Sequence, residues 1–91
     1  QKNPEFGPAL MQMAIIRYEQ GNYLGARAYI QRLQQAASLN PQTLWLAVQT
    51  EYALNDHQAW GEYAIILKNN FPDSDETALL LEWENERRSK Y

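Results

Sequence analysis

Residues 17–29 read RYEQGNYLGARAY, and this stretch decides how the chain folds. It ends an amphipathic run with Gly21, and glycine adopts the left-handed backbone conformation that terminates helices at little cost. Asn22 follows, and an asparagine side chain accepts hydrogen bonds from the first free amides of a new helix. Tyr23 and Ala26 then place an aromatic and a small residue on that next helix. The stretch therefore predicts a helix, a tight turn and a second helix.

Length and composition limit the classes of protein that this chain can represent. Its 91 residues are enough for one small domain, and 45% of them are hydrophobic, which is typical of a folded protein. The small net charge of -3 fits neither a basic nucleic-acid-binding surface nor a disordered acidic tail. The chain has no cysteine, which excludes disulfides, thiolate metal sites and a cysteine nucleophile.

The first residue is glutamine, and no run of about 18 apolar residues occurs. We therefore expect the chain to be a fragment of a longer protein. The absence of a signal or lipid anchor then says nothing about the whole protein.

Glycine and proline divide the chain into segments whose apolar residues recur with helical spacing. We expect five helices, at residues 8–20, 23–38, 42–54, 57–70 and 74–89. Asn40 before Pro41 is typical of a helix start, because proline at the first helical position has no amide to leave unpaired. Asp73 and Glu76 have the spacing of a capping box at the start of the last helix.

The apolar pattern repeats along the chain at an interval of about 35 residues, which is close to the length of known helical repeats. Five pairs show it: Leu10 and Trp45, Met13 and Val48, Gly21 and Asp56, Ala26 and Gly61, and Ile30 and Ile65. Two helices in a period of about 34 residues are typical of a tetratricopeptide repeat. In such a repeat, a small residue at Ala26 or Gly61 lets the two helices of a pair approach closely.

The fold predicted from this pattern is an all-α solenoid of tetratricopeptide repeats. The first repeat covers residues 8–40, the second covers 41–72, and a capping helix covers 73–90. The second repeat is degenerate, because Gln49 and Lys68 stand where a small residue is usual. Residues 1–9, QKNPEFGPA, are expected to be the end of a preceding repeat.

A narrower resemblance covers almost the whole chain. The run from Leu10 to Arg32, and later FPDSDE before a leucine-rich helix, resemble the carboxyl-terminal repeats of the PilF/PilW family of type IV pilus biogenesis proteins. The resemblance implies a pilotin, which is a lipoprotein on the periplasmic face of the outer membrane. It also implies a secretin subunit as the partner, which the protein helps to localise and multimerise. The alternative is a bacterial tetratricopeptide scaffold that binds a helical or extended peptide in another complex.

The residues that could act in catalysis or metal binding do not form a catalytic pattern. His57 follows Asp56 in a predicted turn, but no nucleophile accompanies them, so we expect a solvated histidine. Glu82, Glu84 and Glu86 point in different directions on a helix and indicate a solvated face rather than a metal site. We therefore expect no enzyme activity, cofactor or metal.

The tryptophans are the other candidates for a ligand site. Trp45 and Trp83 fall on core positions of the repeat, so core packing is expected for them. Trp60 lies outside such a position, and partial exposure would make it a candidate binding residue.

Protein binding is the remaining class of function. First helices of successive repeats line the concave face of a solenoid, where partners usually bind. The predicted binding residues are Met11, Ile15, Tyr18, Leu46, Thr50 and Ala53. These positions carry no lysine, arginine or asparagine, which argues against a clamp for carboxylates and favours an amphipathic helix or apolar strand. The alternative is that neighbouring helices bury part of this stripe.

The amino-terminal end offers a second surface for contacts. If preceding repeats are missing, the face of the first helix that they would cover is exposed. Phe6, Leu10 and Ile16 are the candidates, and we expect self-association through them.

Overall fold

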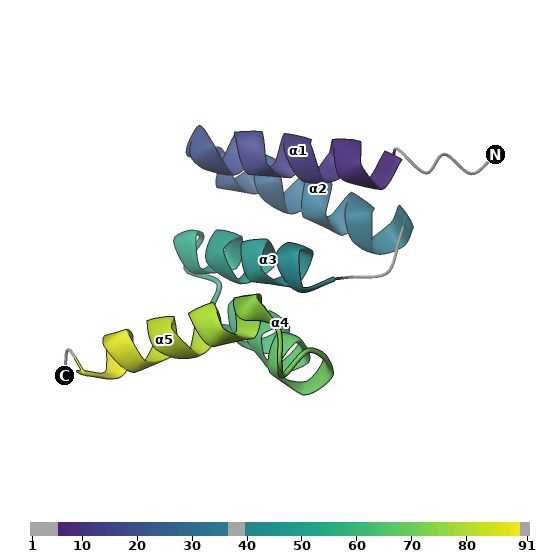
Figure 1. The fold of residues 1–91 in the computed structure, drawn as a ribbon. Helices are drawn as coiled ribbons and strands as arrows, with labels where there is room; N and C mark the ends of the chain where they lie inside the picture. The colour runs from purple at the N-terminus through teal and green to yellow at the C-terminus, as the bar shows by residue number, and fades with distance from the viewer. Residues whose placement is uncertain (1–5, 37–39, 90–91) are drawn as a thin grey trace.

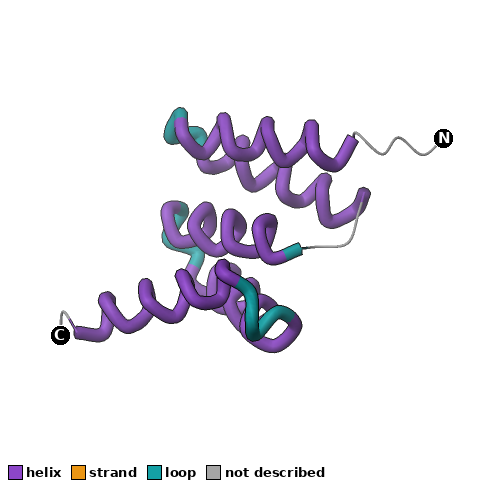
Figure 2. Tube along the Cα trace, viewed as in Figure 1, coloured by secondary structure: helices purple, strands orange, loops and turns teal. Residues whose placement is uncertain are grey.

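The structure is a computed structural model that describes residues 6–36 and 40–89, with side chains described for residues 9–36 and 40–87. Its helices are α1 (Phe6–Glu19), α2 (Tyr23–Ala36), α3 (Pro41–Ala53), α4 (His57–Asn70) and α5 (Asp75–Ser89). The described residues contain no strand (Figure 2). The predicted all-α fold with five helices is confirmed. Residues 37 and 38, the predicted end of the second helix, lie outside the described residues, as do residues 1–5 of the expected preceding repeat.

The helices form two antiparallel pairs and a fifth helix that crosses the second pair. In Figure 1, α1 runs alongside α2, α3 lies below them, and α5 crosses α4 at the lower end. Helix α3 contacts all four other helices. The resulting molecule is elongated, with extents of 49 × 28 × 19 Å.

The turns inside the two pairs have the same backbone structure. Gly21 has a φ of +79° and Asn55 has a φ of 62°, so both occupy the left-handed region. In the first turn the Asn22 amide donates to the Arg17 carbonyl at 2.8 Å. In the second turn the Asp56 amide donates to the Glu51 carbonyl at 2.9 Å. Each of these positions in the second turn lies about 34 residues after its counterpart in the first turn, which is the period of a tetratricopeptide repeat. We call this correspondence the turn register.

The helix starts repeat in the turn register as well. The side chain of Asn22 accepts from the Gly25 amide at 3.0 Å, and Asp56 accepts from the Ala59 amide at 3.1 Å. The predicted cap of the third helix is confirmed, because the Thr43 amide donates to the Asn40 side chain at 2.8 Å.

The predicted capping box at the start of the last helix is wrong. Helix α5 begins at Asp75, and the residue that caps it is Ser74, whose hydroxyl accepts from the Thr77 amide at 3.1 Å. The side chain of Asp73 therefore precedes the capping position by one residue. Ser74 corresponds to Asn40 in the turn register, so α5 starts as α3 does.

The register predicted from the apolar pattern is also wrong, by one residue. Residues that share a place in successive pairs follow the turn register: Leu10 matches Leu44 and not Trp45, and both leucines are buried. Ile30 matches Ala64, also buried, whereas Ile65 is 57% exposed. The error arose because apolar residues occupy both candidate positions, so the pattern alone did not distinguish them.

Two apolar clusters form the interior. One joins α3, α4 and α5 and contains Leu44, Val48, Ala64, Leu67 and Leu80. The other joins α1, α2 and α3 and contains Ala14, Ile30, Leu46 and Ala47. Helix α3 supplies residues to both clusters, because it is buried on two sides.

The small residues expected between paired helices differ in their surroundings. Ala26 is fully buried, in keeping with a close approach of α2 to α1. Gly61 is not a contact point, because a Cβ atom built there meets nothing within 4 Å. The turn register explains this result, since Ala26 is matched by Trp60 and not by Gly61.

The burial of Ala26 makes a testable prediction. Replacing Ala26 with leucine should lower the free energy of unfolding by about 1–3 kcal/mol, because the added atoms have no space between the helices. The matched control is Ala28→Leu, at an exposed site on the same helix. We expect that variant to unfold within about 0.5 kcal/mol of the parent chain in urea. Equal stability of the two variants would contradict the close approach at Ala26.

Thr50 supplies a second prediction, because its hydroxyl is buried and makes no hydrogen bond. Valine keeps the shape and removes the unpaired group, so Thr50→Val should raise the free energy of unfolding by about 1 kcal/mol. Thr77→Val is the control, since the buried Thr77 hydroxyl donates to the Phe71 carbonyl at 2.6 Å. Thermal melts of both variants check this prediction, and Thr77→Val should lose stability in them. A loss of stability in Thr50→Val as well would disprove the prediction.

Candidate functional site

The predicted binding stripe is divided between buried and exposed positions. Leu46 is 7% exposed and Thr50 is 0% exposed, whereas Ala53 is exposed. Met11, Ile15 and Tyr18 are half-buried and pack against the cluster that contains Leu46. The expectation that Leu46 is exposed is therefore wrong. It is buried because this side of α3 faces the first pair, where the Thr43 hydroxyl lies 3.8 Å from the Met11 sulfur. The alternative, burial of part of the stripe by neighbouring helices, is what the structure shows.

The turn register places a different set of residues in line with α1. Met11 corresponds to Trp45 on α3 and to Leu79 on α5, and Tyr18 corresponds to Tyr52. None of these side chains is fully buried, and Leu79 is 47% exposed. We call Met11, Ile15, Tyr18, Trp45, Tyr52, Leu79 and Trp83 the first-helix row.

Two rings of this row, those of Tyr52 and Trp83, and the ring of Trp60 on α4 contact one another edge to face. Tyr52 and Trp83 have ring centroids 4.8 Å apart, Trp60 and Trp83 are 5.2 Å apart, and Tyr52 and Trp60 are 6.0 Å apart. Edge-to-face contacts of this kind stabilise aromatic pairs beyond the burial of their area. Trp45 also contacts Trp83, at 6.2 Å.

The tryptophans only partly match the expectation from sequence. Trp45 and Trp83 pack against the core of α3, α4 and α5 as expected, but both keep part of their surface exposed. Trp60 is partly exposed, so it is a candidate binding residue.

Arg87 lies over all three rings of this group. Its guanidinium carbon is 5.0 Å from the centroid of Tyr52, 5.2 Å from that of Trp83 and 5.4 Å from that of Trp60. Each distance is within the range of a cation–π interaction. Arg87 was not among the residues predicted from sequence, although its position four residues after Trp83 on a helix would have placed the two side chains together.

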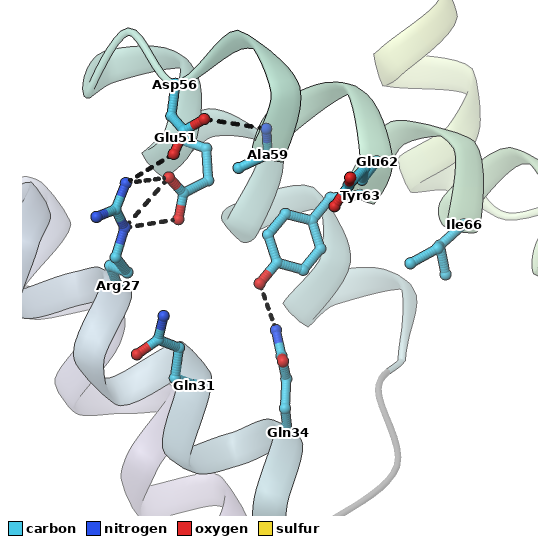
Figure 3. A pocket seen from close by; sticks show the side chains of 9 residues that line it. All are labelled: Arg27, Gln31, Gln34, Glu51, Asp56, Ala59, Glu62, Tyr63 and Ile66. Atoms are coloured by element: carbon cyan, nitrogen blue, oxygen red, sulfur yellow. Dashed lines mark hydrogen bonds and ion pairs between the residues drawn. The ribbon is translucent and has the colours of Figure 1, made fainter.

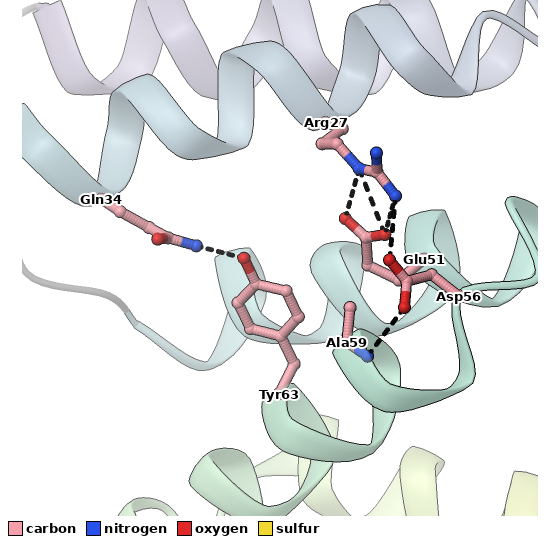
Figure 4. A network of polar contacts seen from close by, with 6 residues as sticks. All are labelled: Arg27, Gln34, Glu51, Asp56, Ala59 and Tyr63. Atoms are coloured by element: carbon pink, nitrogen blue, oxygen red, sulfur yellow. Dashed lines mark hydrogen bonds and ion pairs between the residues drawn. The ribbon is translucent and has the colours of Figure 1, made fainter.

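A polar crevice of about 420 Å³ lies between α2 and α4 (Figure 3). At one end Arg27 donates three hydrogen bonds to Glu51, from Nε to Oε2 at 3.0 Å and to Oε1 at 3.2 Å, and from Nη2 to Oε1 at 2.6 Å. Arg27 also reaches Asp56 at 3.3 Å (Figure 4). At the other end the Gln34 amide donates to the Tyr63 hydroxyl.

The Arg27 network links the first helical pair to the second. The hydrogen bond to Glu51 raises the pKa of Arg27, and the charges of Glu51 and Asp56 add to this effect, whereas desolvation opposes it. Glu51 is 4% exposed, so its carboxylate depends on Arg27 as a partner. This network was not predicted from sequence, because its members come from different helices.

The other candidates from the sequence are His57 and the glutamates of α5. His57 is exposed and accepts a hydrogen bond from the Trp60 ring nitrogen at 3.3 Å. Glu84 pairs with Lys68 at 3.0 Å, while Glu82 and Glu86 are exposed. Within the described residues, no group of three histidine, cysteine or carboxylate side chains is placed to hold a metal.

Within the part of the chain that the structure describes, the surroundings of Tyr18 also shift its pKa. Burial raises the pKa of Tyr18, and the neighbouring Tyr23, whose ring centroid is 5.3 Å away, raises it further. Tyr18 therefore stays neutral throughout the physiological pH range, as its place in an apolar row requires.

The expected amino-terminal patch is smaller than predicted. Leu10 is 4% exposed, so the expectation that it is uncovered is wrong. It is covered because α1 already packs on α2 and α3. Ile16 is 40% exposed, as expected, and the side chain of Phe6 lies outside the described ones.

Comparison of the chain with protein-family models, curated proteins and solved structures finds no match. Among the described residues, none of the helices has both the length and the apolar character needed to cross a membrane.

The Arg27 network makes a prediction about stability. Arg27→Met should lower the free energy of unfolding by about 1–3 kcal/mol, because it leaves the buried Glu51 carboxylate without its partner. This range is below that for fully buried pairs, since the Arg27 side chain is 30% exposed. The double variant Arg27→Met with Glu51→Leu should recover most of the loss in urea titrations. A double variant as unstable as the single one would show that the pair contributes through packing alone.

Proposed function

We propose that this chain is a tetratricopeptide-type solenoid that binds a protein partner. The observation that carries the proposal is the recurrence of the same turn and caps at an interval of about 34 residues, the period of that repeat. Gly21 and Asn55 occupy equivalent turns, and Asn40 and Ser74 occupy equivalent helix starts. In this proposal residues 8–40 and 41–72 are the two repeats.

Helix α5 acts in this proposal as the capping helix of residues 73–90. The buried Leu44 and Val48 of α3 correspond to Ala78 and Glu82 of α5, both of which are exposed. The terminal unit of a solenoid needs a polar outer face, because no further repeat covers it. The glutamate at position 82 therefore favours the end of a solenoid at α5 over a further helical pair.

The first-helix row is the surface that we propose for the partner. Its side chains are aromatic or aliphatic, and several are partly exposed, so apolar burial supplies most of the affinity. An amphipathic helix or an apolar strand of the partner fits such a surface. Met11, Ile15 and Tyr18 remain in the proposed site, and Ala53 is an exposed residue beside it, whereas Leu46 and Thr50 are buried and are not part of it.

We further propose, from the resemblance to the PilF/PilW family, that the partner is a secretin subunit. The protein would then act on the periplasmic face of the outer membrane as a pilotin. Its lipid anchor would lie outside this chain, and no nucleic acid, cofactor or catalytic step takes part. A tetratricopeptide scaffold in another complex is the alternative, which the secretin experiment below distinguishes.

The test compares two exposed faces of the same fold. The first variant carries Ala53→Glu and Leu79→Glu, both at exposed positions beside or within the first-helix row. The control carries Leu24→Glu and Ile65→Glu on α2 and α4, where these side chains are 64% and 57% exposed. Both variants should keep the helicity and melting temperature of the parent chain, because neither change buries a charge.

Binding to purified secretin subunits and formation of secretin multimers are then measured. We expect the first variant to bind at least about tenfold more weakly, since it places two charges in an apolar interface. The control should stay within about twofold of the parent chain. If the folded first variant binds and assembles secretin normally, the proposed face is wrong. If the parent chain itself does not bind secretin, the alternative scaffold is favoured.

A further inference from the structure

The three rings of Tyr52, Trp60 and Trp83 come from three different helices and meet around one point. Each pair of rings is edge to face, so the rings do not stack on one another. The Arg87 guanidinium carbon lies 5.0 to 5.4 Å from all three centroids. Rings arranged around one cation in this way form an aromatic cage, a type of site that recognises organic cations.

We propose that this cage binds an arginine side chain of a protein partner, and that Arg87 occupies it until the partner's arginine takes its place. The inference rests on the proposed protein-binding function, because Tyr52 and Trp83 belong to the first-helix row. It adds the chemistry of one anchor residue of the partner, which the apolar row alone does not specify.

The occupant seen in the structure supports a guanidinium rather than an ammonium group. A guanidinium is planar and weakly hydrated, and it stacks on aromatic faces more readily than a lysine ammonium does. The charge of the surroundings favours a cation as well. Helix α5 carries five carboxylates and two arginines, and the whole chain has a net charge of -3. Such a field attracts a basic segment of a partner.

Arg87 is suited to act as an exchangeable occupant. It lies in the last turns of α5 and is only half-buried, and Tyr52 beside it is 38% exposed. A tethered side chain competes with an external ligand at an effective concentration on the order of millimolar. An isolated arginine peptide should therefore bind the parent chain weakly, and removal of Arg87 should strengthen that binding.

The experiment uses the 91-residue chain and two short peptides, acetyl-Gly-Arg-Gly-amide and its citrulline counterpart. Citrulline has the shape of arginine without the charge, so it separates cation binding from packing. Binding is followed by tryptophan fluorescence and by calorimetry. Arg87→Ala should bind the arginine peptide about tenfold more tightly than the parent chain does. Neither protein should bind the citrulline peptide to a measurable extent.

Two further variants make the result specific to the cage. Arg32→Ala removes another arginine, which stacks on Tyr29 at 5.4 Å, and should leave peptide binding unchanged. Tyr52→Leu in the Arg87→Ala background removes one wall and should abolish the gain. If Arg87→Ala loses helicity, Arg87→Gln is used in its place, because glutamine keeps part of the aliphatic stem. Loss of helicity in both would show that Arg87 is a structural element and would overturn the proposal.

Other outcomes also decide the question. Equal affinity of the parent chain and the Arg87→Ala variant for the arginine peptide would overturn the exchange. Equal binding of citrulline would show an apolar pocket instead of a cation site. Self-association of the parent chain that is lost in Arg87→Ala would assign the cage to a second copy. Secretin binding that depends on Leu79 but not on the cage would leave the proposed function standing and reject this inference alone.

Discussion

Helix α3 is buried on two sides, and this burial positions the four other helices. Leu44 and Val48 face the cluster shared with α4 and α5, while Leu46 and Ala47 face the cluster shared with α1 and α2. A helix that is apolar on two sides needs neighbours on both, because either side would otherwise expose a large apolar patch. The two helical pairs are therefore joined through α3, which supplies residues to both clusters.

Polar contacts then determine how the pairs meet at the edge of this interior. The bidentate bond from Arg27 to Glu51 crosses from α2 to α3, and its geometry permits little sliding. Thr77 joins α5 to the end of α4, because its hydroxyl donates to the Phe71 carbonyl. Apolar packing alone would tolerate shifts between helices, and these directional bonds restrict them.

The same packing leaves α1, α3 and α5 with partly exposed apolar side chains in equivalent places. In the proposed solenoid, interior residues that repeat produce surface residues that repeat beside them, and these would form the binding face of the proposal. At the lower end of that face, Tyr52, Trp60 and Trp83 are brought together with Arg87. A cation anchor next to an apolar row would give the binding face both orientation and affinity.

The local features of the fold follow from short stretches of the sequence. The five helices, the left-handed Gly21 and the cap at Asn40 were all predictable, because each depends on the chemistry of residues within one turn of helix. The spacing of Asn22 and Asp56, whose side chains cap α2 and α4, also indicates the correct register of the two pairs.

The register of the pairs and the position of the candidate site depend instead on contacts between helices. Leu44 and Trp45 are both apolar, and a one-residue shift turns a helix by about 100°, so periodicity alone did not show which of them is buried. The burial of Leu46 depends on a neighbouring pair and not on its own helix. The aromatic cage and the Arg27 network likewise join residues from separate helices, whose distances no local pattern encodes.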